Sequence, residues 1–248
     1  VLGSSEDVRK VELKDLESAR LELINNAKVV IICSGDFDVE LVKKWASEAF
    51  SSDRSPCELF DISSPAANDF RVVEENLPME QSKFHFGFRT HLPEHLMDRE
   101  AHSLACAVLG GGVQGRLFRD IREDRSLAYG IYSQLHGRKN ILSIEAGIDE
   151  SCAGQVQEAI CQHVEDLIDS GPSEEELQFA KARRLNSLAS IADSEASMAS
   201  YYHSRYLLNL HNSPADSAAA CQEVSQEEVQ KAASFWEKDL AYLMSPGS

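Results

Sequence analysis

The pattern of apolar and polar residues predicts a helix, a strand and a second helix in the first fifty residues. The helix is predicted over residues 14–26, where apolar side chains recur at helical spacing. These side chains are Leu16, Ala19, Leu23 and Ile24. The run KVVIICSGD at 28–36 is rich in β-branched residues and is typical of a buried strand. Asp38 is placed to cap a helix over 39–50.

Periodicity is lost after residue 50 and returns near residue 70. Residues 51–69 (SSDRSPCELFDISSPAAND) are rich in Ser, Pro and Asp, which is typical of a linker. Strands are predicted beyond it over residues 70–75, 81–90, 127–136 and 140–149. Helices are predicted over residues 98–109, 115–124, 151–169, 173–192, 195–210 and 225–236. The last two strands should form a hairpin that turns near 137–140, and Ser173 with Glu176 has the capping-box pattern.

The two ends of the chain are similar to each other. Residues 11–36 and residues 224–248 both have the pattern of a helix followed by a short apolar strand that ends near Ser-Gly or Pro-Gly. Such a repeat favours duplication. It would be explained if residues 1–50 were the closing helix–strand–helix of a preceding homologous domain and residues 70–248 a second domain.

Composition and charge narrow the class of protein. Of the 248 residues, 43% are hydrophobic and 26% are charged, which excludes a disordered or collagen-like chain. The net charge of −17 would repel a phosphate backbone and attract a basic partner, so we expect no nucleic-acid binding. No apolar run approaches the roughly 18–20 residues that span a bilayer, and no signal peptide is visible, so we expect no membrane partner.

The cysteines and the first residue add two expectations. The six cysteines contain no C-x-x-C pair, which predicts a reduced, cytoplasmic chain. Because residue 1 is Val, we expect a fragment or a processed product.

The segment HLPEH at 91–95 matches the inverted zinc signature H-x-x-E-H. In that signature both histidines lie on one helix, and Pro93 would interrupt such a helix. Glu174, Glu175 and Glu176 lie at a distance that suits a third ligand, but we expect them in a solvated first turn of a helix. We interpret the match as accidental and predict no metal site in this chain. The alternative, a stand-alone metalloenzyme, requires that Pro93 leave the helix intact.

The glycine-rich stretch LGGGVQGRLFRDIREDRSLAY at 109–129 is the second candidate. Its glycines permit positive φ and close backbone approach, although a helix C-cap and turn would need no more. Neither phosphate-loop pattern is present. Arg122 could hold a carbonyl or carboxylate, and Tyr129 could direct its hydroxyl toward a neighbouring surface. The alternative is that Arg122 is an ordinary surface arginine and that Tyr129 is packed against its neighbours.

This stretch closely resembles the C-terminal domain of the insulinase and mitochondrial-processing-peptidase family of zinc metallopeptidases, in the pitrilysin clan. The matching residues run from Leu109 through Gly110, Gly111, Gly112, Arg116, Leu117, Phe118, Ile121, Arg122 and the segment 123–129 to Tyr132 and Ser133. The preceding and following elements keep the family's order over nearly the whole chain. The resemblance implies an α+β fold with a sheet whose helices pack on one face.

The resemblance also implies that the two halves of such an enzyme have different roles. The zinc helix belongs to the N-terminal half, so this half would contain no catalytic residue and no metal, and its partner would be a zinc-bearing N-terminal domain or subunit. Arg122 and Tyr129, with the glycines at 110–112, would bind a peptide substrate, and the charge of −17 is compatible with a basic one. The alternative is a non-catalytic subunit or interaction module. An apolar strand at 28–36 without its sheet predicts a homo-oligomer.

Overall fold

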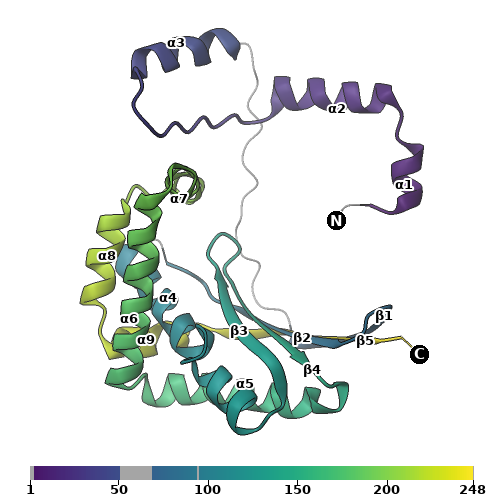
Figure 1. Ribbon diagram of the computed structural model, residues 1–248, viewed down its shortest axis with the longest axis vertical. Coiled ribbons are helices and arrows are strands. Elements are labelled where there is room, and N and C mark those ends of the chain that lie inside the picture. Colours follow the sequence, from purple (N-terminus) through teal and green to yellow (C-terminus); the bar gives the residue numbers. More distant parts are fainter. Residues whose placement is uncertain (1–2, 51–68, 94, 248) are drawn as a thin grey trace. The chain divides into compact units, whose positions relative to one another are not determined.

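The computed structural model describes residues 3–50, 69–93 and 95–247 of the chain (Figure 1). The chain divides into two compact units, Val1–Asp61 and Ile62–Ser248. The predicted linker falls on residues 51–69, and all of it except Asp69 lies outside the described residues. The predicted division into domains at 1–50 and 70–248 therefore stays a prediction.

Three helices form the regular structure of the first unit within residues 3–50. They are α1 (Ser5–Lys10), α2 (Leu13–Asn26) and α3 (Val39–Ala49). The prediction of α2 is confirmed, and Asp38 caps α3 as expected, with Oδ1 accepting from the backbone N–H groups of Glu40 and Leu41 at 2.9 and 3.3 Å. No residue among 3–50 is buried, so these helices have no hydrophobic core of their own.

The strand predicted at 28–36 is wrong for this structure. Residues 29–34 belong to no strand, and Val29 and Ile31 remain 40% and 39% exposed. A β-branched run favours extended backbone, but a strand is stabilised only by pairing with neighbours across a sheet. None of the described strands pairs with this segment.

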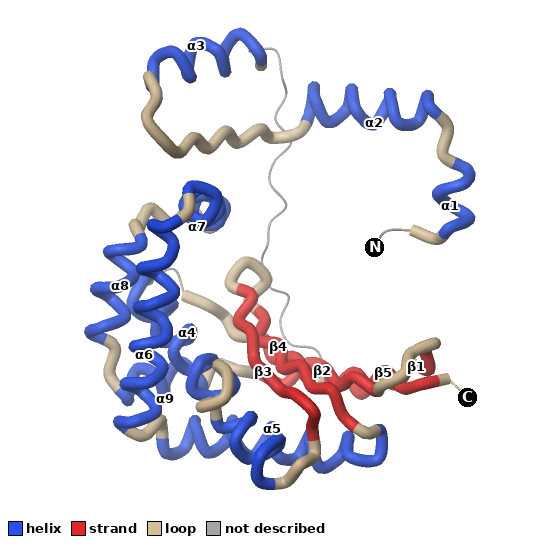
Figure 2. Tube along the Cα trace, viewed as in Figure 1, coloured by secondary structure: helices blue, strands red, loops and turns tan. Residues whose placement is uncertain are grey.

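The second unit contains one mixed five-stranded sheet, drawn in red in Figure 2. Its strands are β1 (Arg71–Leu77), β2 (Ser82–Arg89), β3 (Ala128–His136), β4 (Ile141–Ile148) and β5 (Glu237–Pro246). The strand order is β1-β5-β2-β4-β3, with β1 parallel to β5 and the other neighbours antiparallel. The predicted hairpin is confirmed as β3 and β4, and β3 is an edge strand.

Most helices of this unit follow the prediction, but α8 forms in a stretch for which no helix was predicted. They are α4 (Leu96–Gly110), α5 (Ala153–Ser170), α6 (Glu174–Ala189), α7 (Glu195–Leu207), α8 (Pro214–Glu223) and α9 (Gln226–Ala233), with 3-10 turns at Glu150–Cys152 and Ser190–Asp193. Ser173 forms the expected capping box with Glu176. The helix predicted over 115–124 is mainly a π-helix, η1 (Phe118–Asp124). None of the described helices is long and apolar enough to cross a membrane.

Alternation along β2 shows which face of the sheet is buried. Phe84, Phe86 and Phe88 are at most 3% exposed and join the core with the helices, whereas Lys83 and His85 point to the other face. The helices gather on one side of the sheet (Figure 1). The predicted α+β fold with helices on one face is confirmed.

Candidate functional site

The glycine-rich turn lets the end of α4 approach the edge strand β3. A Cβ atom on Gly110 would lie 2.7 Å from the backbone nitrogen of Ser133, which no side chain could tolerate. Gly112 has a φ of +108°, and a Cβ there would lie 2.4 Å from Nη1 of Arg183. Gly110 is therefore required by close packing against the backbone, and Gly112 by its positive φ, since the flexible Arg183 side chain could move away. Their predicted contact with a substrate, and that of Gly111, stays a prediction.

Arg122 is placed on the π-helix η1. Its side chain is exposed, and its guanidinium carbon lies 4.6 Å from the centre of the Phe118 ring. The ring supports the guanidinium from one side through a cation–π contact and leaves its N–H donors available to a ligand. π-helical turns are rare and occur frequently at functional sites.

Tyr129 is set out from the sheet by a β-bulge. Ala128 lies opposite Ile148 and Gly130 lies opposite Gly147, so Tyr129 has no residue opposite it on β4. Bulges re-aim side chains in this way. The side chain of Tyr129 is 60% exposed, and this is the placement that a ligand-binding tyrosine needs.

The hydroxyl of Tyr129 donates a hydrogen bond to Oδ1 of Asp149 at 2.9 Å. This hydrogen bond, followed by the negative charge of Asp149, raises the pKa of Tyr129. The hydroxyl is therefore a protonated donor at neutral pH, held in place by a carboxylate that a substrate carbonyl could replace.

Two further tyrosines on the sheet are bonded in the same way. Tyr132 donates to Oε2 of Glu145 at 2.5 Å, and Tyr242 donates to Glu75. In each case the hydrogen bond to the carboxylate raises the pKa of the tyrosine. The three tyrosines thus share one chemistry, a phenol hydroxyl paired with an acidic side chain.

The strand register places several of these groups in one row. Glu145 lies opposite Tyr132 on one side and His85 on the other, and His85 lies opposite Tyr242. These residues alternate with buried ones along their strands, so they lie on the face of the sheet that the helices leave open. This face offers hydroxyl donors and carboxylate acceptors to an extended peptide.

The HLPEH segment does not form a metal site in the described residues. Pro93 precedes α4 and His95 caps it, so the segment is a loop, as predicted, while Glu94 lies outside the described residues. His91 Nε2 lies 3.3 Å from Glu237 Oε2, and His95 Nδ1 lies 3.8 Å from Asp98 Oδ2. The two imidazoles have separate partners, and among the described residues no three candidate ligands gather. The donors present therefore do not fit a zinc ion.

Glu176 differs from the solvated residue that the sequence predicts. Its carboxylate accepts two hydrogen bonds from Arg116, at 2.7 and 2.8 Å, and Arg116 also donates to the carbonyl of Gly171. Both side chains are more than four-fifths buried. This bidentate ion pair connects the glycine-rich stretch to the start of α6. Arg116 therefore has a structural role that the spacing of apolar residues does not predict.

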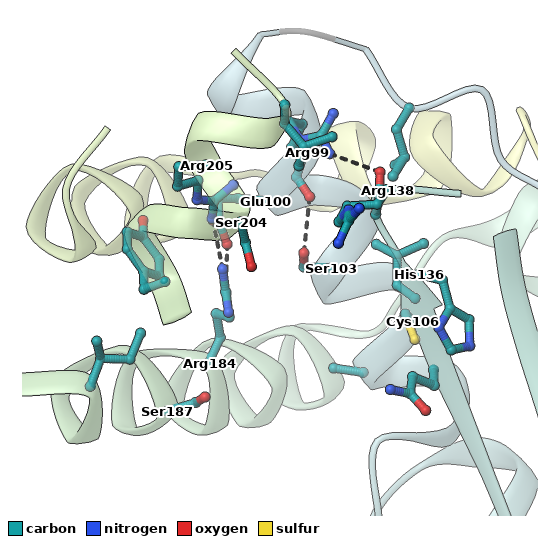
Figure 3. Close-up of a pocket in the computed structure, with 18 of the residues that line it drawn as sticks. Arg99, Glu100, Ser103, Cys106, His136, Arg138, Arg184, Ser187, Ser204 and Arg205 are labelled. Carbon is teal, nitrogen blue, oxygen red and sulfur yellow. Dashed lines mark hydrogen bonds and ion pairs between the residues drawn. The ribbon is translucent and has the colours of Figure 1, made fainter. Parts of the chain in front are cut away.

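Sequence reasoning missed a cavity of about 1260 Å³ bounded by α4, the end of β3 with its turn, α6 and α7 (Figure 3). Gly111 lines it, whereas Arg122 and Tyr129 do not. Cys106 is its one lining thiol among the described residues, and burial raises the pKa of that thiol to about 11, so it is no nucleophile at neutral pH. The Arg183-Arg184 pair was the available signal, but its partners come from distant segments.

Comparisons with known proteins show the family of the chain. Residues 10–184 match a family model described as the peptidase M16 inactive domain. A probable inactive metalloprotease of Bacillus subtilis is 21% identical over 246 residues, covering 98% of this chain and 58% of that protein. An uncharacterized zinc protease of Mycobacterium bovis is 26% identical over 242 residues, covering 94% and 55%.

A solved structure shows the same fold. The peptidase M16 inactive domain from Pseudomonas fluorescens superimposes with a TM-score of 0.75 at 19% identity, over 99% of this chain and 60% of that one. The chain therefore spans somewhat more than half the length of the relatives that it matches.

Proposed function

The chain belongs to the peptidase M16 family as an inactive-domain protein, and we propose that it forms the wall of a peptide-binding chamber opposite a zinc-bearing domain. The observation that carries the proposal is Tyr129, which the bulge in β3 sets out from the sheet as an exposed, protonated donor. The zinc and the general base would come from the partner domain or subunit. This chain would hold and orient the peptide.

Tyr129 would act on the carbonyl oxygen of the bond to be cleaved. Its hydroxyl would leave Asp149 and donate to that oxygen, and the hydrogen bond would strengthen as negative charge develops there. Asp149 would keep the phenol oriented between turnovers. The role is therefore one of transition-state stabilisation and not of proton transfer.

Arg122 lies seven residues before Tyr129 in the sequence. It would bind the backbone or a carboxylate of the substrate. Phe118 beneath the guanidinium limits its movement and leaves its donors facing outward. The open sheet face, with Glu145 and Asp149, would suit a peptide that carries basic side chains. Peptide affinity should then fall as salt is added, because exposed ion pairs are screened.

The test uses this chain assembled with a zinc-bearing M16 domain and a fluorogenic peptide. Tyr129→Phe should lower kcat by about 10²–10³-fold with little change in KM, the usual loss when one donor to a developing oxyanion is removed. Arg122→Gln should mainly raise KM. The matched control is Tyr132→Phe, which removes an equivalent tyrosine–carboxylate pair on the same face and should change kcat less than threefold. Equal losses for Tyr129→Phe and Tyr132→Phe would refute the assignment.

A non-catalytic subunit is the second candidate, because one relative is described as a probable inactive metalloprotease. The sequence that accompanies this chain in its full-length protein separates the two. An intact helical H-x-x-E-H supports the peptidase, and a degraded one supports the subunit. In the subunit, Tyr129→Phe would leave partner binding unchanged and no peptide would be cleaved.

A further inference from the structure

The cavity between α4, α6, α7 and the β3–β4 turn has a charge opposite to that of the chain. Six cationic side chains line it: Arg99, Arg138, Lys139, Arg183, Arg184 and Arg205. Among the residues that the structure describes, Glu100 is the only lining carboxylate, which leaves a formal excess of five positive charges. The whole chain has a net charge of −17, so this excess is local to the cavity.

Glu100 is already committed to holding one of these arginines. It is 1% exposed and accepts hydrogen bonds from Nε and Nη2 of Arg184 at 2.7 and 2.8 Å, with Arg205 4.0 Å away. In Figure 3, Arg184 extends from α6 toward Glu100 on α4. A buried bidentate pair of this kind fixes the guanidinium in position.

The other cations have no acidic partner in the part of the chain that the structure describes. Arg99 donates to two backbone carbonyls, of Pro93 at 3.0 Å and Gly137 at 3.2 Å. Burial, and then the charge of Arg205, lower the pKa of Arg99, as expected in a positive environment. Arg138, Lys139 and Arg183 are exposed and form no ion pair with a described carboxylate. Their charge is therefore available to a ligand.

Serine side chains complete the lining. Ser103 and Ser133 already donate to the carbonyls of Arg99 and Cys106, at 3.0 and 2.8 Å. The hydroxyls that remain as donors to a ligand are those of Ser187, Ser197, Ser200 and Ser204. Guanidinium forks and hydroxyl groups are the donors that proteins use to bind carboxylate or phosphate oxygens. Burial raises the pKa of the Cys106 thiol to about 11, so this thiol is not a nucleophile at neutral pH.

The shape of the cavity favours an extended ligand. Seven consecutive residues, 133–139, line it, and these belong to the edge strand β3 and its turn. At about 1260 Å³ the cavity exceeds the roughly 300–1,000 Å³ of pockets that hold small molecules. A short stretch of polypeptide fits this volume and this run of lining residues better than a single anion does.

We propose that this cavity binds an acidic segment of a polypeptide, with side-chain carboxylates of Asp or Glu held by Arg99, Arg138 and Arg183. Clusters of arginine are a common means of recognising acidic motifs. A peptide with a few carboxylates can place all of them in the cavity, whereas a nucleic acid would extend its phosphates over an acidic chain. Because Arg122 and Tyr129 do not line the cavity, this proposal is independent of the proposed function.

The experiment measures fluorescence anisotropy of a labelled eight-residue peptide rich in glutamate, with the complete chain and no zinc-bearing partner. A peptide with glutamine in place of glutamate is the ligand control. We expect the glutamate peptide to bind at least tenfold more tightly, with an affinity that falls as salt rises. Arg138→Glu with Arg183→Glu should weaken binding by about tenfold or more, the loss expected for charge-assisted hydrogen bonds.

The matched control variant is Arg20→Glu with Lys231→Glu, which changes the net charge equally at exposed positions that do not line the cavity. It should bind the glutamate peptide within about threefold of the native chain. If the variant with Arg138→Glu and Arg183→Glu loses its folded circular dichroism spectrum, Arg138→Gln with Arg183→Gln replaces it. The same tenfold loss of affinity is expected. Equal binding of the two peptides, equal losses in the two variants, or stronger binding of an oligonucleotide than of the glutamate peptide would each overturn the proposal.

Discussion

The two ends of the chain carry the same pattern and form different structures. Residues 11–36 contain α2 followed by an apolar segment, and residues 224–247 contain α9 followed by another. The helix forms in both regions. Only the second apolar segment becomes a strand, β5, whereas residues 29–34 in the first do not.

The difference follows from what each segment has beside it. β5 lies between β1 and β2, where Leu243 is opposite Phe84 and is 7% exposed. Before it, α9 buries Val229, Ala232 and Ala233 in the core. In the first region α2 buries nothing. A helix satisfies its own backbone, but a strand needs partners to do so, and alternation or β-branching supplies only the tendency.

The largest effect that separates the first unit from the second should come from the two tryptophans of the chain. Trp236, between α9 and β5, is 5% exposed and donates from Nε1 to Nδ1 of His102 at 3.2 Å. Trp236→Ala should lower the free energy of unfolding by about 3–5 kcal/mol, because it opens a cavity in the core. Trp45 on α3 is 56% exposed, and Trp45→Ala should cost no more than about 0.5 kcal/mol.

Urea denaturation followed by far-UV circular dichroism measures both variants on one scale. A native-like midpoint for Trp236→Ala would show that β5 and its helix contribute little to the core. A large loss for Trp45→Ala would show that the first unit is stabilised by contacts of its own, and the contrast between the two regions would then disappear.

A pH dependence caused by His102 should affect the second unit alone. His102 is 1% exposed, and burial, followed by the charge of Arg99, lowers its pKa to about 4 from the usual 6.5. Between these values the unfolded chain binds a proton that the folded chain excludes, so stability falls as pH decreases from 6.5 to 4. The full loss below that window is about 3 kcal/mol. The first eighty-four residues contain no histidine to respond in this range.

The measurement is the free energy of unfolding at pH 7.5, 6, 5 and 4.5. His102→Gln keeps an acceptor for Trp236 and removes the titrating group, so its curve should be flatter over the same interval. If that variant and the native chain lose stability in parallel, the decline comes from groups other than His102.

The smallest effect concerns pairing of the first region with a second copy. Exposed Val29 and Ile31 make residues 29–34 a candidate for strand pairing, so we expect a dimer at micromolar concentration. Ile31→Pro should raise the dimer dissociation constant about tenfold, since proline removes a ladder donor. Leu13→Pro is the control, because proline is tolerated at the first position of α2. A native chain that light scattering finds to be monomeric would contradict this prediction.

The candidate site shows how far local reasoning extends. Pro93 places HLPEH in a loop, and the sequence alone was sufficient for that because proline acts within one turn. The bulge that exposes Tyr129 depends on the register between β3 and β4, which no residue within the stretch specifies by itself. The role of Glu176 depends on Arg116, sixty residues earlier in the chain.

The basic cavity is a feature that local reasoning along the sequence could not predict. Its cations come from α4, from the β3–β4 turn, from α6 and from α7. Each appears in the sequence as an ordinary charge on a helix or turn of an acidic chain, and its partners are visible only after folding.

The amino-acid sequence by itself determined most of the helices, though not α1 or α8, together with the hairpin, the caps at Asp38 and Ser173, and the family resemblance. All of these depend on neighbours within a few residues or on a contiguous motif. The tertiary structure alone decided which of two similar apolar segments became a strand, and which arginines share a cavity. The physical reason is the same for both. Strand pairing and charge clustering depend on groups that lie far apart along the chain, and their free energies exist only once folding has brought those groups together.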